Sequence, residues 1–327
     1  MSFKLIKETE LHDDFEIEIL TGLSQSPKKL SSKYFYDEYG SELFQQITHH
    51  NDYYLTKSEK EILATRSNDL IKNILDANID LIELGVGDGH KTTHLINAIL
   101  NNKKRLKYIP IDISEKAFQQ MNEIYSKTHN GEFETLGIVA DYIDGIRIAK
   151  KQSNSRVLLL FLGSNIGNFD STNTKSFLKK IWNQLNHGDY FLIGFDLKKD
   201  ISTLMRAYND SDGLTEKFNL NILNRINNTM QADFKIENFQ HFGCYNPILG
   251  AMESFLISLK DQDVYVKKLS QVFSFKRYEP IHLEYSFKYL ESDIFDLAKK
   301  TGYLVEEIYH DSRKFFANAL WKVEKNV

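Results

Sequence analysis

Apolar residues follow two alternating spacings along the middle of the chain. From Ser58 to Leu75 they recur about every 3.6 positions, which predicts an amphipathic helix. Short apolar runs have the length of buried strands, and they lie at 79–84, 106–111, 136–140, 157–162 and 190–196. Helical patterns separate these runs. Strands that alternate with helices predict an α/β fold with a doubly wound parallel sheet.

The pattern changes after residue 196. Residues 200–228 are helical in spacing, whereas residues 234–289 form longer runs rich in Phe, Tyr and Val that predict antiparallel strands. Residues 295–323 predict a helix and a strand pair that return to the first sheet. Residues 1–57 fit neither pattern. We therefore expect two domains, one of residues 58–196 plus 289–327 and one of residues 1–57 plus 197–288.

Composition and charge exclude several classes of protein. The 327 residues carry a net charge of -4, so a general nucleic-acid binder is not expected. The longest apolar run, Val157–Leu162, is far shorter than the ~20 residues of a membrane helix. Cys244 is the single cysteine, which excludes an internal disulfide and a cysteine metal cage. We expect a cytoplasmic monomer that acts on a small molecule, without membrane partners.

A glycine-rich turn follows the first buried strand. Gly85, Gly87 and Gly89 are spaced by two, which fits neither the dinucleotide fingerprint nor a phosphate-binding loop. Glu83 followed by Gly-x-Gly-x-Gly is similar to the first motif of Rossmann-like methyltransferases that use S-adenosylmethionine. That cofactor has no phosphates, so its loop needs backbone that approaches closely rather than an anion site.

Acidic residues end the next two strands. Asp112 follows the second strand and Asp141 follows the third, with Tyr142 beside it. Open α/β sheets bind ligands at the carboxyl ends of their strands, where Asp112 can accept hydrogen bonds from ribose hydroxyls. Similarity to methyltransferases implies that Asp141 meets the adenine amine and that Tyr142 lies against the base. Alternatively, both aspartates are helix N-caps.

Longer motifs resemble the histidine Nα-methyltransferase family of ergothioneine biosynthesis, over nearly the whole chain. They are Tyr36–Phe44, Tyr53–Glu59, Glu83–Thr92, Phe161–Asn168, Asp196–Asp200 followed by Tyr208, and Ile281–Lys288. The resemblance implies a Rossmann-like class I methyltransferase domain that binds S-adenosylmethionine and an α+β domain that binds the substrate. It also implies three successive methylations of the α-amine of L-histidine, which give hercynine.

The same resemblance assigns roles to single residues. The implied cofactor contacts are Gly85, Lys91, Asp112, Asp141 and Tyr142. The implied substrate contacts are Tyr53, Asn168 and Tyr208 at the amino-acid end, and Glu284, Tyr285 and Ser286 at the ring. Of these, Tyr53 and Asn168 are the candidate catalytic residues. Positioning is the main catalytic effect expected, because a sulfonium is already an excellent leaving group.

The spacing of Glu284 and Ser286 suits an imidazole ring. Residues two apart point to the same side of a strand. A carboxylate accepts from the ring N–H, and a hydroxyl serves the other nitrogen as donor or acceptor. Spacing alone favours a solvated strand face that also carries His282 and Lys288, whereas the family resemblance favours the ring contact.

Two departures from the family pattern leave the substrate open. Asn165 stands where members often carry Thr, and Ser254 stands where histidine-specific members carry a larger Met. A smaller side chain enlarges the pocket, so N-methylation of another aromatic amino acid, such as tryptophan or a prenylated tryptophan, is an alternative. A non-catalytic cofactor-binding module is a further alternative of a different class. No metal is expected, because His90 and His94 lack a third ligand.

Overall fold

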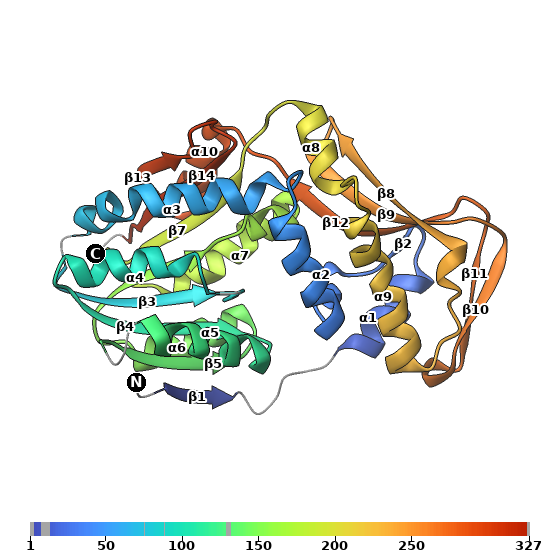
Figure 1. The fold of residues 1–327 in the computed structure, drawn as a ribbon, viewed down its shortest axis with the longest axis horizontal. Coiled ribbons are helices and arrows are strands. Elements are labelled where there is room, and N and C mark those ends of the chain that lie inside the picture. The colour runs from blue at the N-terminus through green and yellow to red at the C-terminus, as the bar shows by residue number, and fades with distance from the viewer. Residues whose placement is uncertain (1–2, 8–13, 75, 88, 129–131, 326–327) are drawn as a thin grey trace. The chain divides into compact units, whose positions relative to one another are not determined.

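The computed structural model describes residues 3–7, 14–74, 76–87, 89–128 and 132–325 (Figure 1). The chain divides into two compact units. Unit 1 comprises Met1–Leu11, Ser58–Leu197 and Tyr289–Val327, and unit 2 comprises His12–Lys57 and Lys198–Lys288. Among the described residues, no helix combines the length and apolar character of a membrane span.

One sheet organises the described part of unit 1. Its eight strands lie in the order β1-β5-β4-β3-β6-β7-β14-β13. They are β1 Phe3–Lys7, β3 Asn78–Leu84, β4 Arg105–Asp112, β5 Glu134–Val139, β6 Arg156–Phe161, β7 Tyr190–Asp196, β13 Tyr303–His310 and β14 Phe316–Val323. The strands run parallel except at the β7–β14–β13 edge, which is antiparallel.

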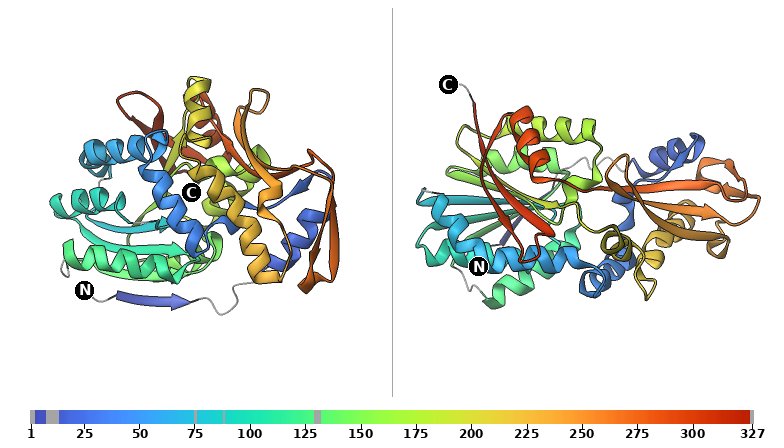
Figure 2. Two further views of the ribbon diagram at one scale, coloured as in Figure 1. Left: turned by 45° about the vertical axis from the view of Figure 1, so that its right-hand side comes forward. Right: turned by 90° about the horizontal axis from the view of Figure 1, so that it is seen from above.

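Helices cover both faces of this sheet, which is why its central strands are apolar on both sides (Figure 2). One face packs against α6 Tyr142–Gln152, α7 Ser171–Gln184 and α10 Glu291–Thr301. The other face carries α3 Tyr54–Asn73, α4 Thr92–Asn101 and α5 Glu115–Thr128. The expected doubly wound α/β fold is confirmed.

Unit 2 is built on a four-stranded sheet in the order β2-β12-β9-β8. Its strands are β2 Lys28–Lys29, β8 Phe239–Asn246, β9 Ala251–Ser258 and β12 Pro280–Phe287, with a separate hairpin of β10 Gln262–Val266 and β11 Gln271–Phe275. Its helices include α1 Phe15–Ser24, α2 Glu38–His49, α8 Ile201–Tyr208 and α9 Leu214–Met230. The buried apolar faces of α1, α2 and α9 pack with β9 and β12 around one core.

The amino-terminal segment differs from expectation. Residues 1–57 were expected in one domain, but Phe3–Lys7 forms β1 and pairs in parallel with β5 at the edge of the unit 1 sheet. This part of the expectation is wrong because five residues with two lysines carry too weak an apolar signal to predict a strand. Residues 15–24 and 38–49 form helices of unit 2.

Candidate active site

The glycine turn after β3 exposes bare backbone. Gly85, Gly87 and Gly89 all have positive φ, at 73°, 56° and 71°, a region that side chains rarely adopt. A Cβ atom on Gly85 would lie 3.2 Å from the Tyr142 hydroxyl oxygen, whereas one on Gly87 would meet nothing within 4 Å. The turn therefore presents an open cradle at Gly87, into which a ligand can approach the main chain.

Asp112 ties this turn to the end of β4. Its carboxylate accepts hydrogen bonds from the amides of Val86 at 3.1 Å and Ser114 at 2.9 Å. Burial raises the pKa of Asp112, although these amides oppose the rise. These bonds go to the glycine turn and to Ser114, the residue before α5 begins, so the side chain holds the glycine turn.

Asp141 is a helix N-cap. Its carboxylate accepts from the amides of Ile143 at 2.8 Å and Asp144 at 3.0 Å at the start of α6. The capping alternative is thus confirmed for this residue. Its side chain is exposed, and the contact with adenine stays a prediction. Tyr142 packs edge-on to Phe161, with ring centroids 5.5 Å apart, and burial raises its pKa.

Lys91 is held by a residue that sequence reasoning missed. Its ammonium forms an ion pair with the fully buried Glu59. The same carboxylate accepts from the Gly163 amide, at 2.9 and 3.0 Å to its two oxygens. Glu59 therefore joins the start of α4 to the loop after β6. Its place in the Tyr53–Glu59 motif was the available signal.

Glu83 lies buried beneath the turn. The hydroxyl of Thr92 donates to it at 2.6 Å, and the Tyr108 hydroxyl donates to its other oxygen. Burial raises the pKa of Glu83 to about 7. Glu83 thus braces the first turn of α4 rather than facing a ligand.

The loop after β6 carries Asn165 and Asn168. It forms a short 3-10 helix, Asn165–Asn168, which begins after Ser164 in the left-handed region. The Asn165 amide donates to the Leu162 carbonyl at 3.0 Å and lies near the Cβ position of Gly85. Asn168 is exposed. Asn165, which stands where family members often carry Thr, therefore lies beside the glycine turn of unit 1.

In unit 2, a bulge in β12 decides which residues share a face. His282 pairs with Phe255 and Glu284 pairs with Ser254, so Leu283 is an extra residue without a partner in the ladder. Because of this shift, Glu284 and the following Ser286 lie on one face of the sheet, while His282 lies on the other. The strict alternation that grouped His282 with Glu284 is therefore wrong.

Tyr208, Ser286 and Lys288 form a buried polar cluster. The Tyr208 hydroxyl donates to Ser286 Oγ at 2.6 Å. Lys288 Nζ donates to the Tyr208 oxygen at 2.9 Å and to Ser286 Oγ at 2.8 Å. Sequence reasoning placed Tyr208 and Ser286 near the substrate but gave Lys288 no role.

This face is not solvated. Ser286 is 5% and Lys288 is 3% exposed, which excludes the solvated strand face. Burial raises the pKa of Glu284 to about 7, although the charge of Lys288 and a hydrogen bond with Ser32 oppose the rise. Glu284 is thus a desolvated carboxylate with a cation nearby.

Tyr285 points away from this cluster. Its ring centroid lies 4.1 Å from that of His282, on the opposite face of the sheet. There the two rings line a pocket of about 310 Å³ together with Lys29, Glu253 and Phe255, among other residues. The prediction that Tyr285 joins Glu284 and Ser286 at the substrate ring is therefore not supported, because neighbouring strand residues face opposite sides.

Tyr53, the remaining predicted substrate contact, belongs to unit 2. It is partly buried, and its ring packs edge-on to Phe44 with centroids 6.2 Å apart. It borders the aromatic core that contains Phe218. The described residues contain no group of three His, Cys, Asp or Glu side chains arranged to hold a metal ion.

Comparison with known proteins adds an independent observation. A family model described as histidine-specific, S-adenosylmethionine-dependent methyltransferase matches residues 15–323. A histidine N-alpha-methyltransferase from Mycolicibacterium smegmatis is 34% identical over 85% of this chain and 85% of that protein. Ergothioneine biosynthesis protein 1 from Schizosaccharomyces pombe is 29% identical over 93% of this chain and 41% of that protein. An L-tryptophan methyltransferase from Psilocybe serbica is 26% identical, with 90% and 89% covered.

Proposed function

The chain belongs to the family of histidine-specific, S-adenosylmethionine-dependent methyltransferases, and we propose on this premise that it methylates the α-amine of L-histidine. Three successive transfers give the betaine hercynine, a step of ergothioneine biosynthesis. The single cysteine suits a reducing cytoplasm, where we expect the enzyme to act as a monomer.

The proposed cofactor contacts lie in unit 1. When bound, S-adenosylmethionine supplies a methyl group on a sulfonium. The residues fit it, because the open cradle at Gly87 admits a ligand and Asp112 can accept from ribose hydroxyls. Asp141 and Tyr142 would hold the adenine, and Glu59 would keep Lys91 in place against the amino-acid end.

One observation in unit 2 supports the proposed substrate contacts. Glu284 lies partly buried on the same sheet face as Ser286, whose hydroxyl is fixed by Tyr208. A carboxylate and a hydroxyl placed in this way match the two edge nitrogens of an imidazole. Such a site discriminates strongly, because a ring without these nitrogens leaves buried polar groups unpaired.

The chemistry requires a neutral amine held in line with the breaking bond. Tyr53, Asn168 and Tyr208 would orient the amino and carboxylate groups, and the amine proton would leave to water without a dedicated strong base. A Tyr53→Phe and Asn168→Ala double variant should lose most of its turnover. Full turnover in this variant would contradict the assignment.

Mass spectrometry of products tests the proposal directly. The protein is incubated with S-adenosylmethionine and L-histidine, L-tryptophan or L-tyrosine, and we expect three methyl groups on histidine alone. Glu284→Gln should abolish most of this activity, whereas Tyr285→Phe, which changes the opposite face, should retain it. Unmodified histidine with the wild-type protein would reject the function.

A second substrate class is favoured by the position of Ser254. This residue is buried and lies directly opposite Glu284 across the strand pair, so a small side chain there leaves room beside the carboxylate. Methylation of tryptophan in the same assay would establish this alternative. Ser254→Met should then suppress the tryptophan product and preserve any histidine product.

A further inference from the structure

We propose that Lys288 sets the direction of the Ser286 hydroxyl hydrogen, so that the site selects a ring with an unprotonated acceptor nitrogen as well as an N–H group. This inference rests on the proposed function, in which Glu284 and Ser286 contact the substrate ring. It makes Lys288 a positioning residue that acts through Ser286.

Lys288 can only donate hydrogen bonds. Its ammonium lies 2.8 Å from Ser286 Oγ and 2.9 Å from the Tyr208 oxygen, so both oxygens accept from it. The ammonium also lies 4.7 Å from the centroid of the Tyr208 ring, which further fixes the tyrosine.

The Tyr208 hydroxyl donates its own hydrogen within the cluster. A phenol is more acidic than an alkyl hydroxyl and is the better donor, and its oxygen already accepts from Lys288. Its hydrogen therefore goes to Ser286 Oγ, 2.6 Å away. Both acceptor sites of the Ser286 oxygen are filled as a result, and its own O–H points out of the cluster.

Because the cluster is buried, the direction of the Ser286 hydrogen affects which rings can bind. Ser286, Lys288 and Tyr208 are 5%, 3% and 9% exposed, so little water is at hand to accept the Ser286 hydrogen. A buried donor without an acceptor is costly. Glu284, on the same face, accepts from an N–H. The two residues together match a neutral azole, whereas an indole or pyrrole leaves the Ser286 donor unpaired.

The binding of histidine and of its two pyrrolylalanine isosteres tests whether Lys288 directs the Ser286 hydrogen. Each isostere replaces one ring nitrogen by C–H and keeps the other as N–H. In calorimetric titrations with S-adenosylhomocysteine present, wild type should bind both isosteres at least about tenfold more weakly than histidine. In Lys288→Met, the Tyr208 oxygen can accept from Ser286, so the preference over the isostere that keeps its N–H at Glu284 should fall below about threefold. The preference over the other isostere, which leaves Glu284 without a donor, should remain.

The control is Lys29→Met, which removes an exposed lysine beside Tyr285 on the other face and should keep the wild-type preference. If Lys288→Met does not fold, Lys288→Gln replaces it, because an amide oxygen also accepts the Ser286 hydrogen. A general loss of structure would weaken all three ligands equally. An unchanged preference over the isostere that keeps its N–H at Glu284 in a folded Lys288 variant would overturn the inference, whereas absence of histidine binding in wild type would reject the proposed function instead.

Discussion

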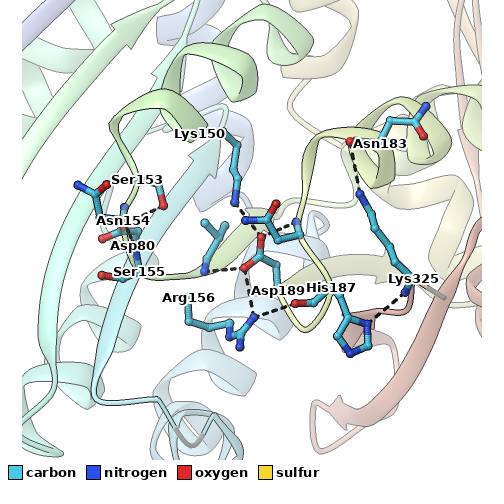
Figure 3. Close-up of polar contacts among 12 residues, drawn as sticks. Asp80, Lys150, Ser153, Asn154, Ser155, Arg156, Asn183, His187, Asp189 and Lys325 are labelled. Carbon is cyan, nitrogen blue, oxygen red and sulfur yellow. Dashed lines mark hydrogen bonds and ion pairs between the residues drawn. The ribbon is translucent and has the colours of Figure 1, made fainter. Parts of the chain in front are cut away.

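The amino-terminal ends and the carboxyl ends of the parallel strands form two opposite edges of the unit 1 sheet. Buried carboxylates at these two edges have different hydrogen-bond partners. At the amino-terminal edge, Asp189 accepts from Lys150 at 2.9 Å and from the amides of Val157 and Asn186 at 3.1 and 2.8 Å (Figure 3). Arg156 lies 3.7 Å away. At the carboxyl edge, Asp112 accepts from two amides and Glu83 from two hydroxyls.

The partners of these carboxylates distinguish a structural role at the amino-terminal edge from a ligand-binding role at the carboxyl edge. Cations neutralise Asp189, which joins the start of β6 to the loop before β7. Asp80 on the same side accepts from the Ser153 hydroxyl and from the amides of Asn154 and Ser155. The hydrogen bonds to Asp112 and Glu83 come from neutral donors, and burial raises the pKa of both. Asp112 at the carboxyl edge thus keeps capacity for a ligand, whereas Asp189 on the opposite side is already satisfied by cations and amides.

The largest expected effect lies at the amino-terminal edge. Asp189→Ala leaves buried amides and a largely buried Lys150 without their acceptor, and we expect a loss of about 4 kcal/mol in the free energy of unfolding. Urea denaturation measures it. Asp170→Ala, which removes an exposed cap of α7, should cost only about 1 kcal/mol. Affinity for S-adenosylhomocysteine should stay within twofold in both, and a tenfold loss in Asp189→Ala would erase the distinction between the edges.

Glu83 predicts a pH dependence of stability. Its pKa is raised from 4.5 to about 7 in the folded protein, so the unfolded chain loses the proton first as pH rises. The wild type should therefore lose stability relative to Glu83→Gln between pH 4.5 and 7, by up to about 3 kcal/mol, and show no further change above that range. Urea denaturation of both proteins across pH 4.5–8 tests this. A constant difference would mean that Glu83 titrates normally.

Asp112 should affect ligand affinity more than stability. Asp112→Ala removes the acceptor that holds the amides of Val86 and Ser114, and with it the proposed ribose contact. We expect S-adenosylhomocysteine to bind about thirtyfold more weakly, equivalent to about 2 kcal/mol. Isothermal titration calorimetry measures this, with Asp170→Ala as the control. Unchanged affinity would remove Asp112 from the cofactor site.

Sequence periodicity predicted most of unit 1 because its buried strands and helices carry strong local patterns. The strand-end positions of Asp112 and Asp141 followed from the same reasoning. Two features lay beyond it. Glu59 contacts Lys91 and Gly163 only through the tertiary fold. The bulge at Leu283 shifts the strand by one residue and moves His282 to the other face, which alternation alone does not reveal.

The smallest expected effect comes from a comparison of one glycine at each edge. Gly85 and Gly188 both have positive φ, at 73° and 81°, so alanine at either position should cost about 1 kcal/mol of stability through backbone strain. A Cβ at position 188 lies 2.8 Å from the flexible end of Arg156, which can move, whereas one at position 85 presses on Tyr142, a proposed cofactor contact. Thermal unfolding should thus report similar losses for both variants. Calorimetry with S-adenosylhomocysteine should show about fivefold weaker binding only for Gly85→Ala, and equal affinities would show that the glycine turn serves folding alone.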